Sequence, residues 1–155
     1  MWTKEWGAKR FQKVVDHLVK KHRIVQLGAK EDPLLQGAED CRGLPFRKAA
    51  AILSQAKLFI GLVGFLMHLA RAVDTRSVIV YGGRERPWQS GYSCNKNIIS
   101  ETPCSPCWRY DDCPGHRVCM DMIQETAVTE AAEATLKTLG EPMPVDKVVL
   151  QRCSF

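Results

Sequence analysis

Apolar residues along the chain follow two different spacings. From Phe11 to Val19 they recur at i, i+3, i+4, i+7 and i+8, the spacing of one face of an amphipathic helix. Three other apolar runs are short, rich in β-branched residues and end close to a glycine, which is typical of buried strands. These runs comprise residues 24–27, 58–63 and 77–81.

Helical patterns separate these strands. Residues 47–55 and a stretch that continues from Gly64 through Val73 read as helices, residues 38–42 as a further short strand, and residues 125–139 as the last helix. Strands that alternate with helices predict βαβ crossovers and a parallel sheet. We therefore expect an α/β fold, a Rossmann-like three-layer domain with a mainly parallel sheet.

The alternation stops between Pro87 and Cys119. This stretch is rich in Cys, Pro, Ser and Asn, and we interpret it as a loop. We expect one domain over residues 1–140, with a cysteine loop at residues 94–119, and a C-terminal tail over residues 141–155.

Composition narrows the class of protein. Hydrophobic residues make up 45% and charged residues 25%, which argues against disorder. The N-terminus has no apolar signal-peptide core, and no apolar run is long enough to span a bilayer, so we expect a cytoplasmic location. The net charge of +5 comes from scattered basic residues, and we interpret the Lys20–Arg23 cluster as a solvated helix end before a nucleic-acid patch. A mildly basic surface would also suit an anionic ligand or a membrane surface.

Two glycine junctions are candidate ligand sites, because ligands of open α/β sheets bind beyond the carboxyl ends of the strands. At Gly64 a strand leads into a helix, and at Gly82 and Gly83 a strand ends beside Arg84. Free helix N–H groups together with an arginine suit a diphosphate. The alternative is that these glycines only permit tight turns.

Four of the seven cysteines form the pattern C-x2-C-x5-C-x5-C. Without a secretion signal, such a set points to metal ligands or free thiols before disulfides. Four thiolates can complete a closed tetrahedral site for zinc or iron that would staple the loop and leave no open position for catalysis. The predicted ligands are Cys104, Cys107, Cys113 and Cys119; free or partly disulfide-linked cysteines are the alternative.

Several motifs in order resemble the C-terminal domain of glycosyltransferase family 9, the bacterial heptosyltransferases. The matching stretches are Lys4–Trp6, Gly43 with the helix that follows it, Gln55–Gly61, Met67–Ala72, Val80–Gly83 and the cysteines from Pro103 to Met120. The resemblance implies one half of a GT-B enzyme, in which the active site lies between two Rossmann-like domains.

The same resemblance implies the activity. Family members transfer a sugar, typically heptose from an ADP-activated donor, to a lipopolysaccharide-type or related acceptor. In the family, the catalytic carboxylate and acceptor surface belong to the N-terminal domain, so we expect no catalytic residue in this chain and no transfer by the chain alone. The implied partners are the nucleotide sugar, the N-terminal domain and an acceptor glycan, lipid or protein, with peripheral association at the inner face of the bacterial inner membrane.

Six positions match donor-binding residues of the family. Lys4 matches a lysine that contacts the donor phosphate, and Gly64 lies where the backbone approaches the phosphates; the others are His68, Tyr81, Gly82 and Arg84. Lys4 could instead be a solvated lysine, and His68 a core histidine. One departure concerns the donor: Val63 occupies the position of a family aspartate and Phe65 that of a glycine, so the donor or its phosphate binding could differ.

A second class of function is a metal-stapled interaction or nucleic-acid-binding module without catalytic activity, built on the cysteines and the positive charge. It predicts nucleic-acid binding that weakens steeply with salt. Because the aromatic residues form no stacking platform on a strand, we prefer the glycosyltransferase hypothesis to a nucleic-acid-binding module.

Overall fold

A computed structural model of the chain describes residues 1–138. Its elements in chain order are η1 (Trp2–Lys4), α1 (Ala8–Leu18), β1 (Ile24–Gln26), β2 (Ala38–Asp40), α2 (Phe46–Gln55), β3 (Phe59–Leu62), α3 (Phe65–Ala72), β4 (Ser77–Gly82), α4 (Pro87–Ser90), β5 (Lys96–Ile99), α5 (Val118–Asp121) and α6 (Glu125–Lys137).

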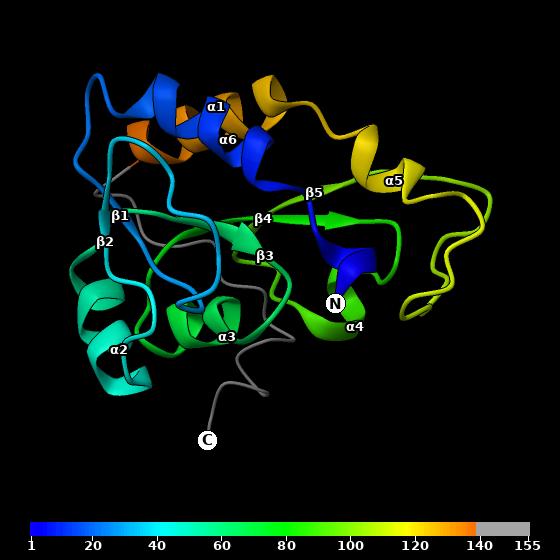
Figure 1. Ribbon diagram of the computed structural model, residues 1–155, viewed down its shortest axis with the longest axis horizontal. Coiled ribbons are helices and arrows are strands. Elements are labelled where there is room, and N and C mark those ends of the chain that lie inside the picture. Colours follow the sequence, from blue (N-terminus) through cyan, green and yellow to red (C-terminus); the bar gives the residue numbers. More distant parts are fainter. Residues whose placement is uncertain (139–155) are drawn as a thin grey trace.

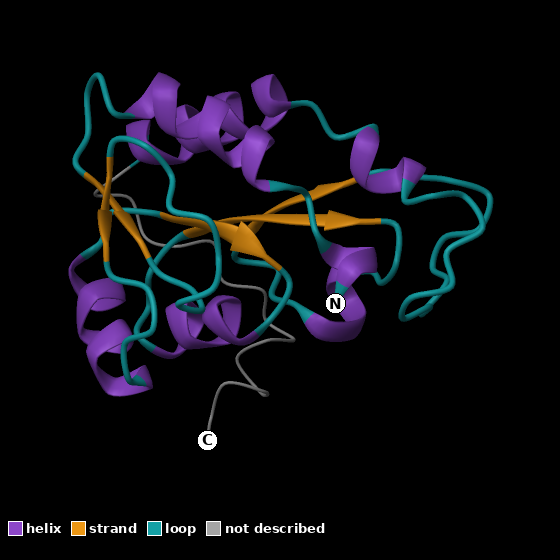
Figure 2. Ribbon diagram, in the orientation of Figure 1, coloured by secondary structure: helices purple, strands orange, loops and turns teal. Residues whose placement is uncertain are grey.

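The elements form three layers (Figures 1 and 2). The strands lie in the middle, α1, α5 and α6 cover one face, and α2, α3 and α4 lie on the other. Such a sandwich follows from the sequence pattern, because strands that are apolar on both faces must be covered on both sides. The described part of the chain includes no helix long and apolar enough to cross a membrane.

Every strand pair in the described residues is parallel, which confirms the expected sheet. β4 lies between β3 and β5, with Leu62 opposite Val80 and Val80 opposite Ile98, while β1 and β2 form a separate hydrogen-bonded pair. The carboxyl ends of β3 and β4 therefore meet at the same edge of the sheet. This edge holds both glycine junctions.

Strand β4 divides the core into two clusters. Val78 and Val80 face α1 and α6, whereas Ile79 and Tyr81 face α3. Alternate side chains of a strand point to opposite faces, so one six-residue buried strand serves both halves of the core.

The interpretation of residues 87–119 as a loop was wrong in part. This stretch contains α4, the start of α5 and strand β5, which pairs with β4 as the third strand of the sheet. The pattern missed β5 because Lys96 and Asn97 interrupt the apolar run, which a half-exposed edge strand tolerates. Leu139, predicted to end the last helix, and the tail at 141–155 lie outside the described residues.

Candidate functional site at the carboxyl edge of the sheet

The Gly64 junction is the more open of the two. Gly64 precedes α3 with an extended backbone, and a Cβ added there would meet no atom of the described residues within 4 Å. The first N–H groups of a helix lack partners within the helix, and its dipole makes this end attractive to anions. The junction therefore offers accessible backbone donors at the carboxyl edge of the sheet.

The residues on either side of Gly64 differ in exposure. Val63 is buried against Met67 in the core cluster beneath α3. Phe65 is 62% exposed at the start of the helix. The position that carries an aspartate in the resembling family thus holds a core side chain here, and an aromatic ring stands beside the helix N-terminus.

His68 lies one turn into α3 and is exposed, so it is not the core histidine considered as the alternative. Its Nδ1 lies 2.8 Å from the hydroxyl of Tyr92, and the two rings meet edge to face at a centroid distance of 5.6 Å. Tyr92 was not among the candidate residues, because it is distant in sequence and belongs to no recognised motif.

The Gly82 junction is closed by packing. Gly82 has a φ of 64° at a register shift between β4 and β5, and an added Cβ would overlap the sulfur of Met120. An added Cβ at Gly83 would overlap the hydroxyl of Ser105 and lie 3.0 Å from Cβ of Cys119. These glycines therefore let the cysteine loop and α5 approach the end of β4.

The side chain of Tyr81 is buried, and its hydroxyl lies 3.6 Å from the sulfur of Met67. Burial raises the pKa of Tyr81 to about 12. In this arrangement its ring supports α3 from within the core.

Arg84 is also buried and is used by the cysteine loop. Its Nε donates to the carbonyl of Arg109 at 2.7 Å, while the backbone N–H of Trp108 donates to the Arg84 carbonyl at 3.0 Å. The guanidinium lies 5.2 Å from the ring centroid of Trp108 and 4.9 Å from that of Tyr110. The arginine expected beside a diphosphate thus holds residues 108–110 against β4.

Lys4 reaches the same region through an ion pair with Glu85, whose side chain is only 3% exposed. Arg84 contacts the same carboxylate oxygen at 3.0 Å. Burial by itself would raise the pKa of Glu85, but the hydrogen bond from Lys4 and the two positive charges outweigh it, so the pKa lies below its ordinary value. Glu85 went unnoticed in the sequence, since nothing local distinguishes it from a surface glutamate.

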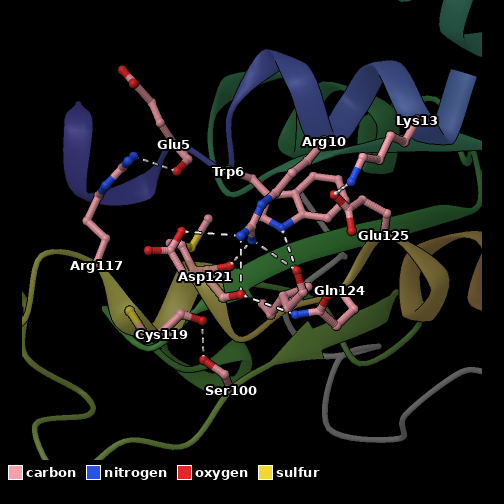
Figure 3. Close-up of polar contacts among 12 residues, drawn as sticks. Glu5, Trp6, Arg10, Lys13, Ser100, Arg117, Cys119, Asp121, Gln124 and Glu125 are labelled. Carbon is pink, nitrogen blue, oxygen red and sulfur yellow. Dashed lines mark hydrogen bonds and ion pairs between the residues drawn. The ribbon is translucent and has the colours of Figure 1, made fainter.

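The N-terminal segment, Trp2–Trp6, contacts Arg117 in the cysteine loop and Ile123 after α5; Glu5, Trp6 and Arg117 are labelled in Figure 3. The indole N–H of Trp6 donates to the carbonyl of Ile123 at 3.0 Å. The guanidinium of Arg117 donates to the carbonyl of Glu5 at 2.9 Å and stacks on Trp2. These contacts place Lys4 at the carboxyl edge.

The four predicted metal ligands differ in their surroundings. Cys119 is buried, Cys107 and Cys113 are partly buried, and Cys104 is exposed. Burial raises the pKa of Cys119, and Cys113 and Cys104 are near enough to raise it further. The described residues nevertheless contain no group of three or more His, Cys, Asp or Glu side chains positioned to hold a metal ion.

A shallow hollow of about 280 Å³ lies at the opposite edge of the sheet, where β4 and β5 begin and α6 ends. Its lining includes Arg76, Lys96 and Thr138, but none of the six predicted donor-binding residues. The hollow and the predicted site therefore lie at different edges of the sheet, and we place the candidate site at the carboxyl ends of the strands.

Comparisons with known proteins bear on the family and the fold of the chain. The model of glycosyltransferase family 9 (heptosyltransferase) matches residues 2–116. Two solved structures of TibC resemble the chain, both at 21% identity. The iron-containing dodecameric glycosyltransferase from enterotoxigenic E. coli H10407 matches with a TM-score of 0.74, over 88% of this chain and 42% of that one. The dodecameric iron-containing heptosyltransferase in complex with ADP-D-beta-D-heptose matches with a TM-score of 0.72, over 89% of this chain and 42% of that one.

A family 9 glycosyltransferase from Veillonella parvula DSM 2008 matches with a TM-score of 0.68 at 22% identity, over 88% of this chain and 43% of that one. The chain thus spans less than half the length of the solved structures it matches. No curated protein sequence matches it.

Proposed function

Since the chain belongs to glycosyltransferase family 9, the heptosyltransferase family, we propose that it supplies the half of the enzyme that binds the nucleotide-sugar donor. The observation that carries this proposal is the open start of α3. Gly64 leaves room beside free helix N–H groups, and His68 stands exposed one turn further on. A diphosphate placed there would accept hydrogen bonds from the backbone and gain from the helix dipole.

Lys4 would add a positive charge to this site. Its ammonium group has three N–H donors, and the ion pair with Glu85 needs only one of them. The side chain remains 22% exposed, so the other donors can face a ligand. A fixed charge of this kind stabilises the diphosphate as it leaves the sugar.

Tyr81, Gly82 and Arg84 would contribute as a framework. The Tyr81 hydroxyl contacts Met67, and the space beside Gly82 is filled by Met120. The Arg84 guanidinium binds residues 108–110. Within the proposed site they fix the end of β4, which lies next to the end of β3.

The donor we propose is ADP-heptose or a related nucleotide sugar, as in the TibC complex. Val63 offers no carboxylate to a ribose or sugar hydroxyl, so the protein would have to hold these groups through other atoms. The acceptor would be a lipopolysaccharide-type glycan or another glycan, lipid or protein, reached at the inner face of the membrane.

Transfer itself would require the part of the matched enzymes that this chain does not cover. We propose that the acceptor surface and the catalytic carboxylate belong to that part. The chain alone would then bind donor weakly and transfer no sugar.

The substitution Gly64→Ala tests the donor site. The added methyl group has space in the folded protein, so we expect an unchanged melting temperature. It would stand where a phosphate approaches the backbone, so the affinity for ADP should fall about tenfold, or about 1.4 kcal/mol. The matched control is Gly115→Ala in the cysteine loop, where the nearest atom would lie 3.6 Å from the new Cβ.

Both affinities are measured by calorimetry. Failure of the wild-type protein, at its full natural length, to bind ADP or an ADP-sugar would refute the donor-binding function. Equal ADP affinities for wild type and Gly64→Ala would remove the site from the start of α3.

We further propose that Cys104, Cys107, Cys113 and Cys119 bind one structural zinc or iron ion. The iron in the TibC structures supports iron, and the C-x2-C pair suits either metal. Because these thiols do not yet form a group positioned to hold an ion, the metal would have to draw the loop closer together. Its contribution would be structural, since four protein ligands leave no open position.

A further inference from the structure

Tyr92 holds the ring of His68 from one side. The hydroxyl of Tyr92 lies 2.8 Å from Nδ1 of His68. The two rings also meet edge to face at an interplanar angle of 81°. An exposed histidine on a helix ordinarily samples several ring orientations, and here two contacts restrict it to one.

Tyr92 is itself well anchored. Its ring packs against the core cluster of Met67, Ile79 and Tyr81 beneath α3. Its backbone carbonyl accepts hydrogen bonds from the side-chain amide of Asn97 at 3.0 Å and from the backbone N–H of Asn95 at 3.2 Å. The position of the hydroxyl is therefore set by the core and by the turn that precedes β5.

We infer that Tyr92 is a positioning residue that fixes the orientation and tautomer of His68, so that the ring presents Nε2–H to the nucleotide sugar. When the hydroxyl donates to Nδ1, the proton of the neutral ring resides on Nε2. Within residues 1–138, the hydrogen bond of the His68 ring is made by Nδ1, and none is made by Nε2. This inference rests on the proposed function, because it assigns the free N–H to an oxygen of the nucleotide-sugar donor.

The physical benefit is pre-organisation. His68 lies one turn from Gly64, and its backbone N–H bonds to the Gly64 carbonyl at 3.4 Å, so the ring belongs to the turn that opens the donor site. A ring already held in the binding orientation loses less rotational freedom when it bonds a ligand. A second side chain that orients the other nitrogen of an imidazole has the same effect at metal sites.

The test is Tyr92→Phe, which keeps the ring in the core and removes only the hydroxyl. In the wild-type protein without ligand, ¹⁵N spectra of the His68 imidazole should show a protonated Nε2 and an unprotonated Nδ1. Tyr92→Phe should give a mixture of tautomers, and the affinity for ADP should fall about three- to tenfold. The control is Tyr110→Phe, whose hydroxyl makes no hydrogen bond among the described residues and which should change neither quantity.

A double-mutant cycle separates positioning from packing. In a His68→Gln background, Tyr92→Phe should cost no further ADP affinity, whereas a purely structural role of Tyr92 would cost the same in both backgrounds. The inference is overturned if Tyr92→Phe leaves both the tautomer and the ADP affinity unchanged. A wild-type protein with the expected tautomer but no ADP binding would instead refute the proposed function, and with it the role toward a ligand.

Discussion

Lys4, from the first turn of the chain, forms an ion pair with the buried carboxylate of Glu85, which follows strand β4. Arg84, which directly precedes Glu85 in the sequence, contacts the same carboxylate oxygen at 3.0 Å. One buried negative charge therefore joins the N-terminal segment to the carboxyl edge of the sheet. The contact between the N-terminal segment and the end of β4 therefore depends on Glu85.

Replacing Glu85 by Gln should destabilise the fold. Lys4 and Arg84 would keep their charges beside a neutral amide, and breaking such a buried pair costs about 3 kcal/mol. Urea unfolding followed by circular dichroism gives the value. The matched control is Glu101→Gln, because Glu101 is 80% exposed and its ion pair with Arg86 spans 3.8 Å. Equal stabilities for the two variants would contradict the structural role of Glu85.

The stability should also depend on pH through Glu85. Its pKa in the folded protein lies below the ordinary value of 4.5, so the unfolded chain takes up a proton first as the pH falls. The contribution of Glu85 is therefore complete above the ordinary value and is lost as the pH drops through the folded pKa. Unfolding curves across the acidic range should show a shallower loss for Glu85→Gln than for wild type, and parallel curves would refute this assignment.

Gly82→Ala should be destabilising by about 2–3 kcal/mol. An alanine there would be held at the positive φ of 64°, which L-residues rarely adopt, and its methyl group would overlap the sulfur of Met120. Gly64→Ala, with an extended backbone and open space, should lie within about 0.5 kcal/mol of wild type. Thermal unfolding of both variants compares a glycine needed for packing with one available to a ligand; similar losses would show that this distinction is wrong.

Arg10 should stabilise the end of α5. Its guanidinium donates to the carbonyl of Met120 at 2.8 Å, of Ile123 at 3.1 Å and of Asp121 at 3.3 Å (Figure 3). Arg10→Ala would leave these carbonyls without a charged donor, at a cost of about 2 kcal/mol.

Hydrogen exchange should then accelerate in α5 in Arg10→Ala. The exposed neighbour Lys9, replaced by Ala, provides the control and should leave exchange unchanged. Protection of α5 that is the same in Arg10→Ala and wild type would show that these bonds contribute nothing.

Metal removal tests the cysteine loop. We expect the purified protein to carry about one equivalent of zinc or iron, and a chelator to lower its melting temperature. Cys107→Ser should reduce the metal content, while Cys41→Ser, directly after β2, should leave it unchanged. Elemental analysis that finds no metal, together with four reactive thiols in the native loop, would refute the site.

Except for η1, α4, β5 and α5, the order of the elements was contained in the local pattern of residues. The run Ser77–Tyr81 reveals a strand because strands buried on both faces are apolar at nearly every position, and Phe11–Val19 reveals a helix because its apolar residues follow a period of 3.6. The parallel pairing followed from the alternation of strands and helices. The ordered set of motifs between Lys4 and Met120 then indicated the family.

The tertiary structure decided what individual side chains do. Arg84 resembled a phosphate ligand in the sequence, yet it holds residues 108–110, and Gly82 makes room for Met120. Strand β5 forms by pairing with the free edge of β4. Its own residues are too polar to predict a strand from the sequence. The roles of Glu85 and Tyr92 depend on partners that are distant along the chain, and only the fold brings Lys4 and His68 beside them.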